Sequence, residues 1–182
     1  MMGQLLSDRL RTLQVNSEDR KALATRAVGS YSAVYRRNPA HKAAGNNLAW
    51  LLCSELNDAN EAYRIMQEVR IVKHSPKPMG GDMLAVEMLD TLAVIYQKLN
   101  KPEYGQERIE LFEAANRRYA EDPRIAVFLA QSYLATGKGR QALQVFQSAR
   151  QLLPKFNLNT EQMSNLNQLI QQGIGDAQKQ SN

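Results

Sequence analysis

The chain contains few of the residues from which an enzyme site is built. Its 182 residues include one cysteine, Cys53, and two histidines, His41 and His74. A lone cysteine cannot form an internal disulfide, and no spacing in the sequence brings either histidine beside it. We interpret the histidines as solvated turn residues and Cys53 as a small packed thiol, rather than as metal ligands or a nucleophile with its base. The sequence therefore predicts a protein that is not an enzyme and that needs no metal or other cofactor.

Long hydrophobic runs are also absent. Hydrophobic residues make up 43% of the chain and charged residues 23%, and no apolar run approaches the ~20 residues that cross a bilayer. The first stretch, residues 1–13, is interrupted by Asp8, Arg9 and Arg11 and so lacks the continuous core of a secretory signal. We expect the chain as written to be cytoplasmic, an expectation that would not hold for a fragment of a larger exported protein.

The sequence has no clear signal for β-structure. No segment alternates apolar and polar residues over a useful length, and no short β-branched run lies between turn signals. Apolar residues recur at helical spacings instead, so we predict an all-α fold.

The clearest helical pattern lies between Pro123 and Pro154. Two apolar stripes are separated by a turn at Gly137, and they contain small residues among large ones: Leu129, Ala130, Tyr133, Ala142, Phe146 and Ala149. This spacing predicts two antiparallel helices that approach closely at the alanines, with the aromatic rings filling the space between them. The segment resembles a tetratricopeptide repeat almost position for position. One such unit cannot bury its apolar face alone, so neighbours of the same design are expected.

Related patterns occur earlier in the chain. A first helix of the same kind recurs at Leu89, Leu92, Ala93 and Tyr96, and a further unit opens at residues 46–52. The resemblance implies antiparallel helix-turn-helix repeats stacked in a right-handed superhelix, a TPR-like α-solenoid with terminal capping helices. It divides the chain into an N-terminal helix or cap (1–16), a half repeat (17–39), full repeats (42–73, 83–122 and 123–154), a Pro/Gly loop (74–82), a capping helix (155–174) and a disordered tail (175–182).

Three helix boundaries are predicted in more detail. Ser17, followed by two acids, is expected to begin the helix of the half repeat. A short helix over about residues 4–13 precedes it. At the other end, Thr160 begins a last helix that is expected to end near Gly173.

The resemblance implies a binding function. In tetratricopeptide arrays the first helices line a concave groove that receives an extended or helical peptide. Carried over position by position, this groove consists of Ala43, Asn46, Trp50 and Cys53 in the first full repeat, Glu87, Asp90, Val94 and Gln97 in the second, and Arg124, Val127, Gln131 and Leu134 in the third. The openings at 46–50 and 90–96 look like those of bacterial arrays, including proteins associated with exopolysaccharide export. We therefore expect a non-catalytic interaction module or scaffold, of bacterial type, that binds a protein or peptide.

Several groove positions have two interpretations. Trp50 is an exposed binding anchor or packs against the half repeat, and Asn46 contacts a peptide backbone or caps a helix. Asp90 contacts a ligand or bridges two repeats. Chaperone-binding members of the family hold a C-terminal carboxylate with basic groove residues, whereas Glu87 and Asp90 stand where those donors are needed. A ligand with a basic or amide-rich group suits these acids better.

The net charge of +5 arises entirely in residues 1–45. It supports two further hypotheses, a homo-oligomer formed through the basic first helices or an exposed repeat edge, and nucleic-acid binding through the same helices. The second hypothesis is the weaker, because the basic residues are spread around their helix: Arg20, Lys21, Arg26, Arg36 and Arg37. A protein, rather than a nucleic acid, is the expected partner.

Overall fold

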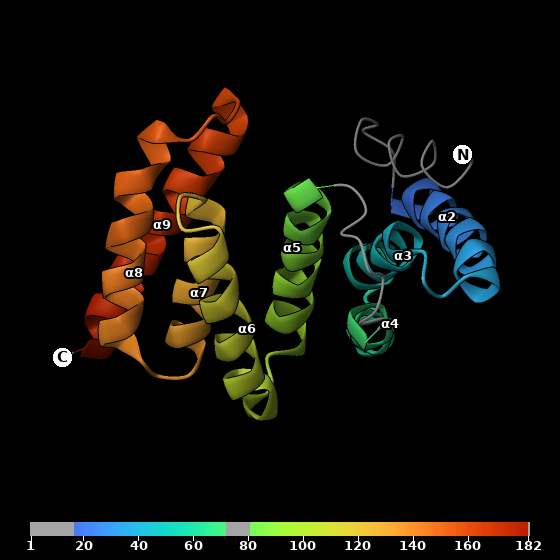
Figure 1. The fold of residues 1–182 in the computed structure, drawn as a ribbon, viewed down its shortest axis with the longest axis horizontal. Helices are drawn as coiled ribbons and strands as arrows, with labels where there is room; N and C mark the ends of the chain where they lie inside the picture. Colours follow the sequence, from blue (N-terminus) through green and yellow to red (C-terminus); the bar gives the residue numbers. More distant parts are fainter. Residues whose placement is uncertain (1–16, 72–80, 182) are drawn as a thin grey trace. The chain divides into compact units, whose positions relative to one another are not determined.

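The computed structural model describes residues 17–71 and 81–181 of the chain. Within these ranges the chain folds into eight α-helices and two short 3₁₀ helices, with no strand, which confirms the all-α prediction (Figure 1). The helices are α2 (Ser17–Arg37), α3 (Lys42–Ser54), α4 (Ala59–Ile71), α5 (Gly81–Leu99), α6 (Gly105–Arg118), α7 (Pro123–Ala135), α8 (Gly139–Leu152) and α9 (Thr160–Ser181), and the 3₁₀ helices are η1 (Pro102–Tyr104) and η2 (Leu153–Lys155). None of the helices seen in the described ranges is long and apolar enough to cross a bilayer.

The chain divides into two compact units, Met1–Leu99 and Asn100–Asn182. In the first unit each described helix packs on its neighbour in sequence, and α5 also packs on α3. In the second unit α6, α7, α8 and α9 pack in the same consecutive way, and α9 also contacts α7. The division falls between α5 and α6, the two helices of the predicted repeat 83–122.

The first unit is held together by small residues where its helices come close. Ala27 of α2 and Ala62 of α4 are fully buried. Gly45 of α3 has no room for a side chain, since a Cβ atom there would lie 2.4 Å from Val69 and 3.0 Å from the ring of Tyr35. Close approach of α3 to both neighbours therefore depends on Gly45.

Side-chain caps fix where several of these helices begin. α2 is described from Ser17 onward, with Glu18 and Asp19 in its first turn. His41 is exposed, as expected for a turn residue, and its Nδ1 atom accepts a hydrogen bond of 3.2 Å from the backbone N–H of Ala44 at the start of α3. Asp58 accepts a bond of 3.0 Å from the backbone N–H of Glu61 at the start of α4.

The segment from Pro123 to Pro154 contains the two helices that its spacing predicts. Gly137, in the turn between α7 and α8, has a φ of +74°, the left-handed conformation that glycine adopts without strain. Ala130, Ala142 and Ala149 are completely buried, and Phe146 is 1% exposed. The predicted core of this helix pair is confirmed.

The last helix is longer than its sequence pattern suggested. α9 continues to Ser181, so the predictions of an end near Gly173 and of a disordered tail over 175–182 are wrong for the described residues. Its apolar stripe extends through Ile170, Gly173 and Ala177, all buried against the α7–α8 pair. At its end Gln180 donates a hydrogen bond of 3.2 Å to the carbonyl of Leu134 in α7. These contacts stabilise the final turns, which have few apolar residues of their own.

Two other predictions concern segments outside the described residues. The helix over 4–13 lies outside them, as do residues 74–80 of the predicted loop, with His74. Gly81 and Asp82, which were assigned to that loop, are the first two residues of α5.

Candidate functional site

The predicted groove residues of the first unit lie on α3 and α5, which pack against each other. Asn46 is only 5% exposed, and its Oδ1 atom is buried without a hydrogen-bond partner in the described part of the chain. Trp50, one turn further along α3, is half-buried. Cys53 is completely buried, and this burial raises the pKa of its thiol. Of these three side chains, only Trp50 presents an appreciable surface.

The groove positions on α5 are more accessible. Glu87 and Gln97 are exposed, and Asp90 and Val94 are half-buried. Their spacing places them along one face of the helix, because three or four residues make one helical turn. The first unit thus presents Ala43 and Trp50 from α3 and these four residues from α5.

Two of the predicted groove residues of the second unit, Arg124 and Val127, make internal contacts. Arg124 forms an ion pair of 2.6 Å with Asp122 and stacks over the ring of Phe156, 5.4 Å from its centroid. Val127 is completely buried in the core of this unit. Gln131 and Leu134 are half-buried. Arg124 thus acts as a structural tie between the start of α7 and the segment after η2.

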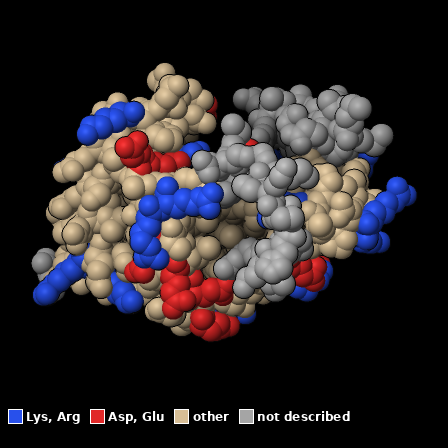
Figure 2. Space-filling model, viewed as in Figure 1, with Lys and Arg blue, Asp and Glu red and all other residues tan. Residues whose placement is uncertain are grey.

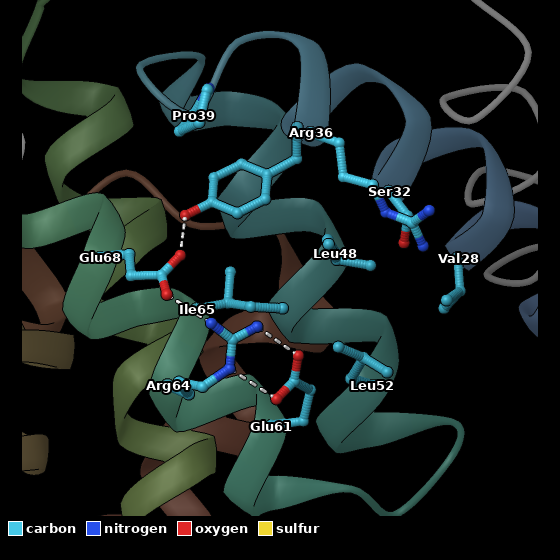
Figure 3. Close-up of a pocket in the computed structure, with 11 residues that line it drawn as sticks. Val28, Ser32, Arg36, Pro39, Leu48, Leu52, Glu61, Arg64, Ile65 and Glu68 are labelled. Atoms are coloured by element: carbon cyan, nitrogen blue, oxygen red, sulfur yellow. Dashed lines mark hydrogen bonds and ion pairs between the residues drawn. The ribbon is translucent and has the colours of Figure 1, made fainter.

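A pocket that the sequence did not reveal lies between α2, α3 and α4 (Figure 3). Its volume is about 330 Å³, and its lining residues are Val28, Ser32, Tyr35, Arg36, Pro39, Leu48, Leu52, Glu61, Arg64, Ile65 and Glu68. Leu48 and Ile65 form an apolar floor, since they are 3% and 2% exposed. Leu48 and Leu52 are each two residues from Asn46 or Trp50, which is about 200° around a helix. The pocket therefore uses the opposite side of α3 from the predicted groove.

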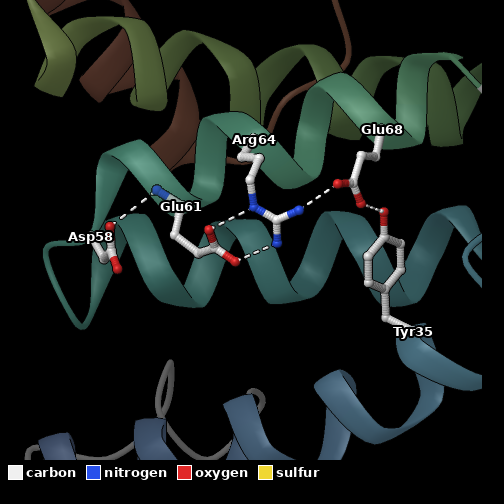
Figure 4. A network of polar contacts seen from close by, with 5 residues as sticks. All are labelled: Tyr35, Asp58, Glu61, Arg64 and Glu68. Carbon is white, nitrogen blue, oxygen red and sulfur yellow. Dashed lines mark hydrogen bonds and ion pairs between the residues drawn. The ribbon is translucent and has the colours of Figure 1, made fainter.

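One wall of the pocket is a connected set of polar contacts (Figure 4). Tyr35 of α2 donates a hydrogen bond of 3.0 Å from its hydroxyl to Glu68 of α4. Arg64 binds Glu61 through two bonds of 2.6 and 2.8 Å and also donates to Glu68. Both carboxylates are therefore engaged by groups of the chain itself.

Two groups of this wall, Tyr35 and Glu61, have shifted pKa values. Burial, reinforced by the hydrogen bond to Glu68, raises the pKa of Tyr35 to about 12, so its phenol stays protonated. The hydrogen bond from Arg64 lowers the pKa of Glu61. Neither Tyr35 nor Glu61 is therefore poised to transfer a proton near neutral pH.

The described ranges contain no group of three or more His, Cys, Asp and Glu side chains arranged to hold a metal ion. No protein-family model, curated protein or solved structure matches the chain.

Proposed function

We propose that the chain is a non-catalytic protein-interaction module of the tetratricopeptide type, with its helices stacked as a right-handed superhelix of about three and a half repeats. The consecutive packing of antiparallel helices and the buried small residues at 27, 62, 130, 142 and 149 support this proposal. The binding surface is the α3–α5 face of the first unit. Its ligand is a peptide or protein segment.

The observation that carries the proposal is that Asn46 and Trp50 lie one turn apart on the same face of α3. The amide oxygen of Asn46 is a buried acceptor without a partner in the described residues, which is a costly arrangement unless a donor reaches it. Trp50 is a large amphipathic side chain of the kind that dominates binding energy at protein interfaces. A peptide backbone N–H would supply the donor that the Asn46 oxygen lacks, and a peptide side chain would pack against the exposed part of Trp50.

A site-specific cross-linking experiment tests this surface. A photoreactive phenylalanine replaces Gln97, which is exposed on α5, and in a matched variant it replaces Gln147, which is exposed on α8. In cells we expect position 97 to capture a defined polypeptide and position 147 to capture none, with Trp50→Ala abolishing the capture. Equal capture at both positions, or capture that survives Trp50→Ala, would reject the α3–α5 surface.

Self-association is the second candidate, and two exposed apolar side chains favour it. Val34 of α2 is 42% exposed and Leu169 of α9 is 44% exposed. Each lies on a helix at one end of the described chain, where a second copy could cover it. Sedimentation at several concentrations distinguishes the two candidates, because a strict monomer rejects this one.

The charge distribution gives no support to nucleic-acid binding. On the face drawn in Figure 2, several Lys and Arg side chains lie next to Asp or Glu side chains. On α2, Arg20 is already paired with Glu55 through bonds of 2.7 and 2.8 Å. A phosphate backbone is best bound by a continuous run of unpaired cations.

A further inference from the structure

In the pocket between α2, α3 and α4, neither of the two lining carboxylates binds the guanidinium of Arg36. Glu61 and Glu68 are bound by Arg64 and Tyr35. Arg36, which lines the same pocket from α2, has no ion pair within residues 17–71 and 81–181. Figure 3 shows its side chain extending along α2 towards Ser32, at the rim of the pocket. An anion at this rim would therefore meet an available guanidinium.

The part of the pocket lining that comes from α2 and α3 contains no acid. From Arg20 to Ser54 the chain contains six Lys or Arg residues and not one Asp or Glu. The next carboxylate, Glu55, is held by Arg20 at 2.7 Å. The α2 and α3 side of the pocket thus carries positive charge next to an apolar floor, whereas the two carboxylates of the lining, Glu61 and Glu68, lie on α4 and are bound by Arg64 and Tyr35.

We propose that this pocket is a second protein-docking site, specific for an acidic segment of a partner protein. An apolar side chain of the segment packs on the floor formed by Leu48, Leu52 and Ile65, and a neighbouring carboxylate pairs with the guanidinium of Arg36. The pocket volume of about 330 Å³ is at the lower end of the ~300–1,000 Å³ range of ligand sites. It suits one anchoring side chain rather than a whole cofactor.

The composition of the pocket favours a protein segment over a nucleic acid. Its floor is aliphatic, and the aromatic ring in its lining, Tyr35, is 7% exposed and hydrogen-bonded to Glu68, which leaves little ring surface on which a base could stack. Glu61 and Glu68 on the α4 side would repel a phosphate backbone that followed the groove. An acidic peptide tolerates them better, because its carboxylate approaches only at Arg36 on the α2 side and its apolar anchor covers the floor.

Peptide selection tests the proposal directly. A displayed library of random dodecapeptides is bound to the whole chain after depletion on the Arg36→Glu variant. We expect enrichment of sequences in which Asp or Glu flanks a Leu, Phe or Met. The affinity of a selected peptide should fall about tenfold or more in Arg36→Glu, and methyl resonances of Leu48, Leu52 and Ile65 should shift on binding.

Arg26→Glu is the matched control, since Arg26 is exposed on the same helix, outside the pocket, and the net charge changes equally. It should change the affinity less than about twofold. Equal losses in both variants, enrichment of basic or uncharged peptides, or shifts elsewhere than the pocket methyls would overturn the proposal. So would displacement of the peptide by mixed-sequence single-stranded DNA. Trp50→Ala should leave this binding unchanged, which separates its failure from failure of the α3–α5 surface.

Discussion

Gly173 of α9 lies directly against the ring of Phe146 of α8. A Cβ atom at position 173 would come within 2.2 Å of that ring, closer than any real side chain is found. Phe146 is itself 1% exposed and belongs to the core of the second unit, so it has little freedom to withdraw. Close packing of α9 on α8 therefore requires a glycine at position 173. This glycine does not mark the end of α9.

Gly173→Ala should destabilise the protein. The added methyl group overpacks the α8–α9 contact, which typically costs about 1–3 kcal/mol and exceeds the helix propensity that alanine gains over glycine. Gly175→Ala is the matched control, because a Cβ atom there meets nothing within 4 Å. It should stabilise by about 0.5–1 kcal/mol. Urea unfolding of both variants measures the difference, and a neutral Gly173→Ala would show that the two helices are not in close contact.

In the second unit, the sequence correctly predicted the α7–α8 pair, in which small and large buried residues lie within one turn of each other. The prediction for α9 was wrong because a glycine in a sequence can indicate either the end of a helix or a close contact between two helices. Gly173 was interpreted as a helix end, whereas it makes a close contact. The sequence did contain the pattern that distinguishes a continuing helix from a helix end, because residues 166, 170, 173 and 177 form one stripe at helical spacing. The spacing of residues could not show that Gly173 packs on Phe146, because the distance between them depends on how α8 and α9 pack.

The sequence also did not show which candidate site residues are buried or where the pocket lies, because both depend on how the helices pack. The groove positions carried over from the tetratricopeptide resemblance lie on α3, α5 and α7, but the burial of Cys53 and Val127 depends on packing that position alone does not give. The pocket was missed because its lining on α2 begins with Val28, Ser32 and Tyr35, which look like an ordinary second stripe. Its polar wall needs Glu68, which is far from Tyr35 in the sequence.

Alkaline pH should weaken the fold through Tyr35. Its pKa is raised from 10.0 to about 12 in the folded chain. The folded state therefore holds this proton between about pH 10 and 12 while the unfolded state releases it, so stability is intact below pH 10 and is lost as the pH rises towards 12. In Tyr35→Phe the decline across this window should be shallower by up to about 1.4 kcal/mol per pH unit.

Tyr133 is an internal comparison for the Tyr35 experiment. Burial and its hydrogen bond of 2.6 Å to Glu113 raise the pKa of Tyr133 to about 12 as well. Ultraviolet titration of phenolate should show a late component that shrinks in Tyr35→Phe and in Tyr133→Phe, and shrinks further in the double variant. A titration in which all tyrosines ionise together near pH 10 would contradict both assignments.

Arg124 should contribute to stability rather than to peptide binding. Removing it in Arg124→Ala leaves Asp122, which is 7% exposed, without its ion pair and removes the stacking on Phe156. A loss of about 1–3 kcal/mol is expected in thermal or urea unfolding, because a buried carboxylate loses its charged partner. Arg140→Ala, which removes an exposed arginine on α8, should stay within about 0.5 kcal/mol of the parent. Unchanged stability in Arg124→Ala would return this residue to the list of candidate ligand contacts.

Lys98 of α5 should control access to the only cysteine. Its Nζ atom donates hydrogen bonds of 2.7 Å to the carbonyl oxygen of Cys53 and 3.2 Å to the side chain of Asn57, so it holds the end of α3 against α5. Lys98→Met keeps the apolar stem and removes these donors, which should lower the free energy of local opening by about 1.4 kcal/mol and raise the alkylation rate of Cys53 by iodoacetamide about tenfold.

The sign of this effect separates opening of the helix from simple electrostatics. The charge of Lys98 lowers the pKa of the Cys53 thiol, against the larger effect of burial, so its removal alone would leave less thiolate and slow the alkylation. A faster reaction in Lys98→Met therefore reports opening of α3. Lys101→Met is the control, because Lys101 makes only an exposed ion pair of 3.8 Å with Glu103, which contributes little. A rate in Lys98→Met that equals or falls below the rate in Lys101→Met would mean that the buried position of Cys53 does not depend on the contact from α5.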